Sequence, residues 1–264
     1  MNKFKVYFGA AGAGAAYVEH SRQNPDFFVD NNPTLWGSKL LGIEIMPPSV
    51  LETEKIFEIT ITSGYVKDIL AQLISMGFSE HQINVPPKST LGKHPFRIIE
   101  NRLIAAHQLS SVMNAIGHKS PLVAVGGSAL GFCRAGDFIE WDFDIDLFAP
   151  KRIRDILPNI LKKNKFTDIC LNEASLECNL LLTEDRSVPV KVDYFDCSLP
   201  TIIDTFESYV WEWNIDMFLD CDQVTVHGNK INVPNPFNTY LEGVYGKTWR
   251  IPNRNFGYSD YAKK

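Results

Sequence analysis

The sequence lacks the features that mark several special classes of protein. Its five cysteines are scattered, odd in number and never spaced as C-x-x-C, so the pattern predicts neither a disulfide framework nor a cysteine zinc site. No apolar run approaches the roughly 18 residues of a membrane span. The stretch from Gly9 to Ala16 is too rich in glycine for the core of a signal peptide. We therefore expect a cytoplasmic protein with no membrane span.

An excess of positive charge is also absent. The 26 lysines and arginines face 31 acidic residues, which gives a net charge of −5 and argues against a nucleic-acid partner. The apolar content of 45% and charged content of 22% are typical of a globular protein. A chain of 264 residues has room for one large domain or two modest ones.

The first 30 residues follow a strand, glycine turn, helix and strand pattern. A short apolar strand, residues 3–8, leads directly into Gly9, Gly12 and Gly14, and a helical stretch follows them. The next strand ends on Asp30, which lies 21 residues after Gly9. This layout resembles the opening of a dinucleotide-binding unit, although its glycines are ordered G-x-x-G-x-G.

A further strand at residues 56–61 and a helix at residues 66–76 continue the βαβ series, and residues 85–89 are typical of a linker. The pattern resembles the small Rossmann-like nucleotide-binding modules of bacterial polysaccharide-biosynthesis enzymes. We therefore predict such a module at residues 1–88. Two interpretations stay open: the module holds a nucleotide or a nucleotide-linked sugar at Gly9, Gly12, Gly14 and Asp30, or it only packs or docks.

A long helix is predicted over residues 96–116, where apolar residues recur every three or four positions between Pro95 and Gly117. It leads to an apolar strand at residues 122–125 and then to a tight turn. That turn consists of Gly126, Gly127 and Ser128, whose backbone N–H groups are suited to cradling phosphate.

Aspartates and apolar residues alternate after the turn. Asp142, Asp144 and Asp146 are separated by single apolar residues, so on a strand all three would share one face. Like charges this close repel unless a cation neutralises them. Alternating charge also protects exposed strands, but together with the glycine turn it favours a Mg²⁺ or Mn²⁺ site for nucleotidyl or phosphoryl transfer.

The run GGSALGFCRAGDFIEWDFDIDL, residues 126–147, resembles the signature of the LicD/fukutin family. The segment YLEGVYGKTW, residues 240–249, resembles the closing motif of that family. Where this family commonly has a basic residue, a glycine, a proline and a further aspartate, the chain has Ala135, Asp137, Glu140 and Phe143. The first three make the loop less basic, which leaves the identity of the donor open.

The resemblance implies a nucleotidyltransferase-fold α+β domain, which we place at residues 95–264, and a mixed α/β protein as a whole. It also implies Mg²⁺ or Mn²⁺ as cofactor, a CDP-alcohol as nucleotide-activated donor and a glycan or sugar as acceptor. The donor phosphates are expected at Gly126, Gly127 and Ser128. Asp142, Asp144 and Asp146 are the predicted metal ligands, with Asp144 and Asp146 as the best pair.

A third carboxylate is expected from a neighbouring strand. In residues 188–196, Asp193 faces away from the apolar alternation, and it is assigned as third metal ligand or as the base that orients the acceptor, ahead of Asp196. Arg134 is suited to a pair of phosphate oxygens, or else pairs on the surface with Asp137 or Glu140.

Residues 202–218 are expected to form a helix that buries Tyr209, Trp211 and Trp213. The function that the resemblance implies is metal-dependent transfer of a phospho-alcohol or sugar phosphate from a CDP-type donor, in surface polysaccharide biosynthesis. Two alternatives stay open. One is transfer of NMP from an NTP to a small acceptor, and the other is a non-catalytic nucleotide-binding scaffold.

Overall fold

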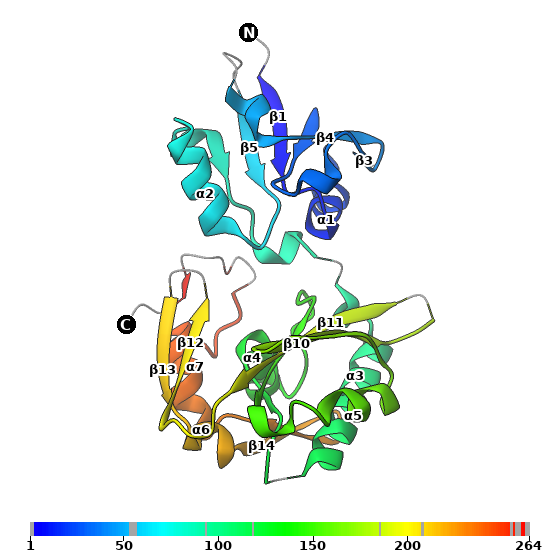
Figure 1. Ribbon diagram of the computed structural model, residues 1–264, viewed down its shortest axis with the longest axis vertical. Coiled ribbons are helices and arrows are strands. Elements are labelled where there is room, and N and C mark those ends of the chain that lie inside the picture. The colour runs from blue at the N-terminus through cyan, green and yellow to red at the C-terminus, as the bar shows by residue number, and fades with distance from the viewer. Residues whose placement is uncertain are drawn as a thin grey trace. The chain divides into compact units, whose positions relative to one another are not determined.

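The computed structural model describes residues 3–52, 57–92, 94–117, 119–184, 186–206, 209–253, 256 and 260–261 (Figure 1). The chain divides into two compact units. The first comprises residues 1–93 and 253–260, and the second comprises residues 94–252 and 261–264. Both contain sheets and helices, so the expected mixed α/β class is confirmed. No helix in the described part of the chain is both long and apolar enough to cross a bilayer.

The first unit is built on one six-stranded sheet with the order β3-β4-β2-β1-β5-β6. All neighbouring strands in it run parallel except β3 and β4. Its elements are β1 (Phe4–Phe8), α1 (Gly12–Ser21), β2 (Phe27–Val29), β3 (Lys39–Leu40), β4 (Ile43–Met46), β5 (Phe57–Ile61), α2 (Val66–Ser75) and β6 (Ile83–Asn84). The strand order reverses at β1, which is the arrangement of a Rossmann-like sheet.

Both faces of this sheet are covered, as parallel sheets require. On one face Val6 and Phe8 of β1 pack with Ile69 and Leu73 of α2. On the other face Tyr7 of β1 packs with residues from α1 and the neighbouring strands. The central strand is therefore apolar on both sides from Val6 to Phe8, where three buried apolar residues follow one another.

The second unit contains a five-stranded sheet with the order β7-β8-β11-β10-β9. Within it β8 and β11 run parallel, and the other neighbours run antiparallel. The sheet strands and the helices that pack on them are α3 (Ile99–Ile116), β7 (Val123–Ala124), α4 (Gly126–Ala135), β8 (Ile145–Pro150), α5 (Leu157–Lys163), β9 (Phe166–Leu171), β10 (Ser175–Leu181) and β11 (Ser187–Phe195). The remaining elements are β12 (Thr201–Phe206), β13 (Tyr209–Asn214), α6 (Asp216–Leu219), β14 (Asp222–Val226), β15 (Asn229–Val233) and α7 (Phe237–Tyr245).

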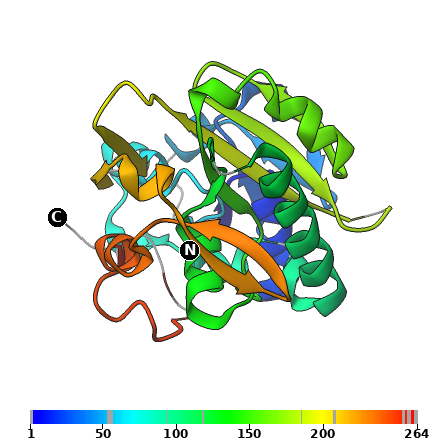
Figure 2. The same cartoon turned by 90° about the horizontal axis from the view of Figure 1, so that it is seen from below.

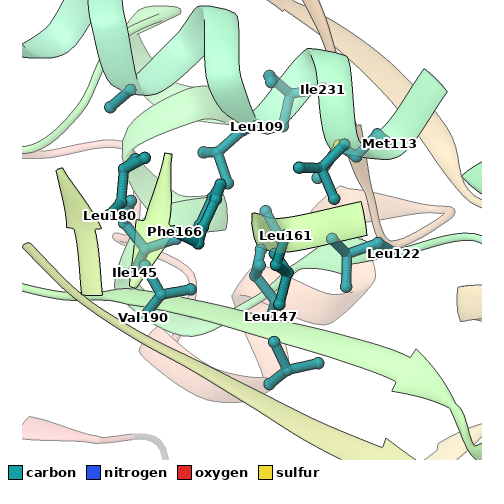
Figure 3. Close-up of a cluster of buried hydrophobic side chains, with 14 of the residues drawn as sticks. Leu109, Met113, Leu122, Ile145, Leu147, Leu161, Phe166, Leu180, Val190 and Ile231 are labelled. Atoms are coloured by element: carbon teal, nitrogen blue, oxygen red, sulfur yellow. The ribbon is translucent and has the colours of Figure 1, made fainter. Parts of the chain in front are cut away.

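One face of this sheet carries the main core of the unit. Ile145 and Leu147 of β8 and Val190 of β11 point into a cluster with Leu109 of α3 and Leu161 of α5 (Figure 3). In Figure 2, which shows the molecule from below, α3 and α5 lie side by side; β15 lies next to α3, and β14 lies next to α4. The alternate residues of β8 and β11 consequently point to the opposite face of the sheet.

The predicted helix over residues 96–116 is confirmed, with two adjustments. Pro95–Arg97 forms a short 3-10 turn, and the α-helix begins at Ile99. Ile99 and Leu103 belong to the predicted apolar stripe but are exposed. The buried stripe includes Ala105, Leu109 and Met113, which pack in the main core of the unit.

The prediction of a helix over residues 202–218 is wrong. Strands β12 and β13 form an antiparallel hairpin, and only a short helix, α6, follows them. The physical reason is a period of two in the sequence, because Tyr209, Trp211 and Trp213 are buried while the residues between them are exposed. The expected burial of these three aromatic residues is confirmed, although on a strand.

Candidate active site

The glycine turn of the second unit forms the beginning of α4. The sequence predicts a tight turn before the helix, and the structure places Gly126 in the first helical position with φ of 55°. Val125 N donates to Asp146 O at 3.0 Å, and Gly126 N donates to Tyr240 Oη at 3.0 Å. These bonds tie the start of α4 to β8 and α7.

Two carboxylates lie directly against this first helical turn. A Cβ atom placed on Gly126 would lie 3.2 Å from Asp146 Oδ2, and one on Gly127 would lie 2.6 Å from Asp142 Oδ2. Ser128 is buried, and its Oγ accepts a hydrogen bond of 3.1 Å from Asp146 N. The glycines therefore allow the carboxylates to approach the helix start, and Ser128 holds the backbone of Asp146 there.

The three aspartates do not all lie on a strand. Strand β8 begins at Ile145, so the prediction that they share one strand face is wrong for Asp142 and Asp144. Asp142 N donates to Ile139 O at 2.9 Å, which bends the chain into a turn ahead of β8. Asp142 still reaches Gly127 from this loop, whereas Asp144 is half-buried at its end.

Asp193 lies on β11, the strand that pairs with β8 in parallel. In that register Lys191 is opposite Asp146, and Asp193 is opposite Phe148, so these side chains share the sheet face away from the core. Asp193 Oδ2 makes an ion pair of 2.9 Å with Lys191 Nζ. The carboxylate expected from a neighbouring strand is thus on the same face as Asp146, and a lysine is its partner.

Asp196, the alternative third carboxylate, lies beyond the end of β11. Its Oδ1 accepts hydrogen bonds from Ser198 N at 2.9 Å and Ser198 Oγ at 2.8 Å. These two bonds lower the pKa of Asp196. The side chain is exposed and caps a turn, which favours Asp193 as the site residue.

Two of the predicted metal ligands lie at one place in the structure. Asp142 and Asp146 both lie at the start of α4. Within the described ranges, no group of three or more His, Cys, Asp and Glu side chains is arranged to hold a metal ion. Mg²⁺ is commonly held by one or two carboxylates and completes its shell with water and substrate phosphates. An ion held by Asp142 and Asp146 would therefore need water and substrate phosphates to complete its shell.

Arg134 lies in the last turn of α4, at the end away from the glycines. It lies eight positions after Gly126, or about 12 Å along the helix axis. Burial lowers the pKa of the Arg134 guanidinium, while Tyr245 raises it. Asp137, one expected surface partner, instead pairs with Arg102 Nη1 at 2.6 Å and His227 Nε2 at 2.7 Å.

Sequence reasoning missed Asp204, because residues 202–218 were assigned to a helix. Asp204 lies on the buried face of the β12–β13 hairpin, where Trp211 is its cross-strand partner. Burial raises its pKa to about 6; a hydrogen bond to Trp213 lowers it, and the charge of Asp193 raises it. Period-two alternation in residues 201–214 was the signal that could have found it.

Tyr240 and Lys191 were also missed as site residues. The Tyr240 phenol is fully buried, and its pKa is raised well above the ordinary value by burial first and then by the charges of Asp204 and Asp146. Trp249, in the closing motif, is buried under Arg250 and next to Phe237. It therefore packs the end of the domain.

The glycines of the first unit have three different surroundings. Gly9 has φ of 121°, and a Cβ atom there would lie 2.3 Å from Thr62 O. A Cβ atom on Gly14 would lie 2.3 Å from Gly9 O, whereas one on Gly12 meets nothing within 4 Å. Asp30 Oδ2 accepts a bond of 2.7 Å from Ala10 N, and its Oδ1 accepts one of 2.8 Å from Asn32 N. Gly9, Gly14 and Asp30 thus shape this turn, and Gly12 leaves the start of α1 open.

The chain is similar to proteins of known structure over part of its length. The first is the UDP-D-quinovosamine 4-dehydrogenase of Vibrio fischeri, at 23% identity and a TM-score of 0.25, covering 32% of this chain and 76% of that one. The second is the lincosamide antibiotic adenylyltransferase LnuA, at 12% identity and a TM-score of 0.35, covering 52% and 85%. No curated protein matches this chain.

A family model matches the part of the chain that contains the site. The match covers residues 120–236, which include the α4 glycines, β8, β11 and the β12–β13 hairpin. Its description is LicD/FKTN/FKRP, nucleotidyltransferase domain. Residues 120–236 of this chain are therefore similar in sequence to the LicD/FKTN/FKRP nucleotidyltransferase domain.

Proposed function

We propose that the chain transfers a phospho-alcohol or sugar phosphate from a CDP-type donor to a glycan or related acceptor, with Mg²⁺ or Mn²⁺, in surface polysaccharide biosynthesis. The match of residues 120–236 supports a nucleotide-related transferase, and the proposal adds the donor, the ion and the acceptor. The signature at residues 126–147 is the reason for choosing a CDP-type donor.

The observation that carries the proposal is the contact between the start of α4 and two carboxylates. The first N–H groups of a helix lack partners within the helix and attract phosphate. Asp142 and Asp146 lie at this same helix start. The two carboxylates alone would repel the phosphates of the donor. A cation bound between the carboxylates and the phosphate oxygens would remove this repulsion, so that the helix start can bind the donor.

Each residue then has a defined task. The amides of Gly127 and Ser128 bind the donor phosphates, and Asp142 and Asp146 would hold the ion, which neutralises phosphate charge when bound. Asp193 orients the hydroxyl of the acceptor and takes its proton, or completes the ligand set. The acceptor oxygen forms a bond to the β-phosphorus, and the bond from that phosphorus to the bridging oxygen breaks. Its electron pair leaves with CMP.

Product analysis tests this proposal. The full chain is incubated with CDP-choline or CDP-ribitol, Mg²⁺ and a panel of sugar acceptors, and CMP is measured by chromatography. We expect CMP release that falls by at least a hundredfold in Asp146→Asn, while the Asp155→Asn control keeps it, since Asp155 is an exposed surface residue. Metal-dependent CMP release unchanged in Asp146→Asn would contradict the assigned site.

Nucleotidyl transfer remains the second candidate, because both reactions use a helix start and paired carboxylates. Pyrophosphate released from an NTP, with no CMP from CDP-alcohols, would favour it. Nucleotide binding with neither product would instead favour a scaffold.

For the first unit we propose a nucleotide or nucleotide-linked sugar at the start of α1. Gly12 supports this proposal, because the space at its Cβ position is open, whereas Gly9 and Gly14 are closed by backbone. A thermal-shift screen with UDP-sugars tests it, since a ligand that binds the folded state raises the melting temperature. Gly12→Leu should abolish the shift without lowering the melting temperature of the free protein.

A further inference from the structure

Lys191 lies in the middle of an acidic face. It is opposite Asp146 of β8 on one side and opposite Glu177 of β10 on the other. Asp193 is two residues further along the same strand and so points to the same face, about 6.6 Å along the chain. One ammonium group therefore has three carboxylates around it, on three adjacent strands.

The contact with Asp193 is direct. Lys191 Nζ lies 2.9 Å from Asp193 Oδ2, with 49% and 43% of the two side chains exposed. Partial burial lowers the pKa of Lys191, but the hydrogen bond to Asp193 and the charges of Asp193, Asp146 and Glu177 outweigh burial and raise it. The carboxylate that Lys191 contacts directly is therefore that of Asp193.

This arrangement bears on the ligand set of the ion. Asp142 and Asp146 meet at the start of α4, and Asp193 shares a sheet face with Asp146, yet no three-carboxylate group exists in the described part of the chain. A carboxylate that already pairs with an ammonium at 2.9 Å is turned towards that group. An ion at Asp146 would also meet the repulsion of the same ammonium.

We propose that Lys191 is a built-in competitor of the divalent ion: it keeps Asp193 out of the ligand set until an ion and a substrate displace it. The lysine therefore sets how tightly the site binds metal in the absence of substrate. This inference rests on the proposed function, because it concerns the same ion. It makes Lys191 a positioning residue that acts through Asp193.

Binding of Mn²⁺ alone to the full chain, followed by electron paramagnetic resonance or calorimetry, tests the inference. Removing the ammonium in Lys191→Met should tighten binding about tenfold, the size expected for one unit charge a few ångströms from a divalent ion in a wet site. Lys191→Arg keeps the charge and should bind as the wild type does.

Lys230→Met is the matched control. It removes one positive charge from the same unit at a side chain that bonds Thr225 Oγ1 on the β14–β15 hairpin, and it should leave the affinity unchanged. Thermal melting of each variant verifies that it is folded. The double variant Lys191→Met with Asp193→Asn should bind Mn²⁺ more weakly than Lys191→Met alone, because it lacks the freed carboxylate.

The outcomes separate this inference from the proposed function. If the wild type binds Mn²⁺ and Lys191→Met binds it no more tightly, the proposed competition by Lys191 is wrong, and the metal site itself is not contradicted. Binding that appears only in Lys191→Met supports the competition. If neither the wild type nor Lys191→Met binds Mn²⁺, both the competition and the proposed function are contradicted. If Lys230→Met binds Mn²⁺ as tightly as Lys191→Met, the effect is one of general charge, and only the competition is contradicted.

Discussion

The chain contains two glycine turns with the same outline, and their surroundings differ. Each joins a strand to a helix and has an aspartate beside it. At Gly9 and Gly14 of the first unit, the missing Cβ atoms leave room for backbone oxygens, and Asp30 is bonded to backbone N–H groups. At Gly126 and Gly127 of the second unit, the missing Cβ atoms leave room for carboxylate oxygens.

This difference shows how a glycine motif should be interpreted. When backbone fills the space, the glycine serves packing and its loss affects folding. When the end of a charged side chain fills the space, that side chain can move aside. Replacing the glycine then changes the position of the charge, and thus the chemistry. The variants below test this contrast, from the largest expected effect to the smallest.

Gly14→Ala should have the largest effect. Its Cβ atom would lie 2.3 Å from Gly9 O, so the helix must shift away from the strand. We expect a loss of about 3 kcal/mol in the free energy of unfolding of the first unit, measured in urea. Gly12→Ala is the control and should be neutral or slightly stabilising, because its surroundings are open. Equal losses in both variants would contradict the interpretation.

Asp204→Asn should change the pH dependence of stability. Burial raises the pKa of Asp204 to about 6, above the unfolded value of about 3.9, so the folded state binds this proton more tightly. The wild type therefore loses stability from this group as the pH rises from about 4 to 6, and the asparagine variant does not.

Relative to wild type, Asp204→Asn should gain on the order of 2 kcal/mol in unfolding free energy between pH 4 and pH 7. Urea titrations at a series of pH values measure this difference, with Asp216→Asn as an exposed control in the same unit. A difference that stays constant over this range would show that Asp204 titrates normally in the folded protein.

Gly127→Ala should lower activity more than stability. The new methyl group displaces Asp142 Oδ2, which would lie 2.6 Å away, and this side chain can rotate. We expect about tenfold slower CMP release, or about 1.4 kcal/mol in the barrier, with a change in unfolding free energy below about 1 kcal/mol. If Gly127→Ala instead loses much stability while the rate of CMP release per folded molecule is unchanged, the glycine serves packing, as in the turn of the first unit.

Tyr240→Phe should have the smallest effect. It removes the acceptor of Gly126 N and leaves that N–H without its protein partner, at a cost of about 1 kcal/mol in unfolding free energy. Tyr7→Phe in the first unit removes a bond to Gln23 O and is the matched control. Only Tyr240→Phe should also slow CMP release, since only that phenol holds the start of α4.

The sequence was sufficient to predict those elements in which apolar residues recur at regular spacing. The parallel sheet of the first unit, the long helix α3, and the face of Asp193 on β11 follow from apolar runs and alternation. It failed where two periods compete. In residues 202–218 the aromatic spacing of two was overlooked, and Asp204 was lost with it.

Other site features depend on contacts between distant segments. The turn at Asp142 ends the apparent alternation early through a bond to Ile139 O, which no spacing shows. The bond from Gly126 to Tyr240 joins residues 114 positions apart. The ion pair of Lys191 and Asp193 could have been expected from their spacing on a strand, but the roles of the two residues could not, because they depend on β8 alongside.

The alternation along strand β8 also limits which insertions and deletions this domain can accept. Ile145 and Leu147 point into the core while Asp146 points to the carboxylate face, so adjacent residues serve opposite sides of one sheet. Deleting a single residue within the strand would place a carboxylate among leucines and an isoleucine beside the glycines. Natural insertions or deletions of a single residue should therefore be excluded from β8.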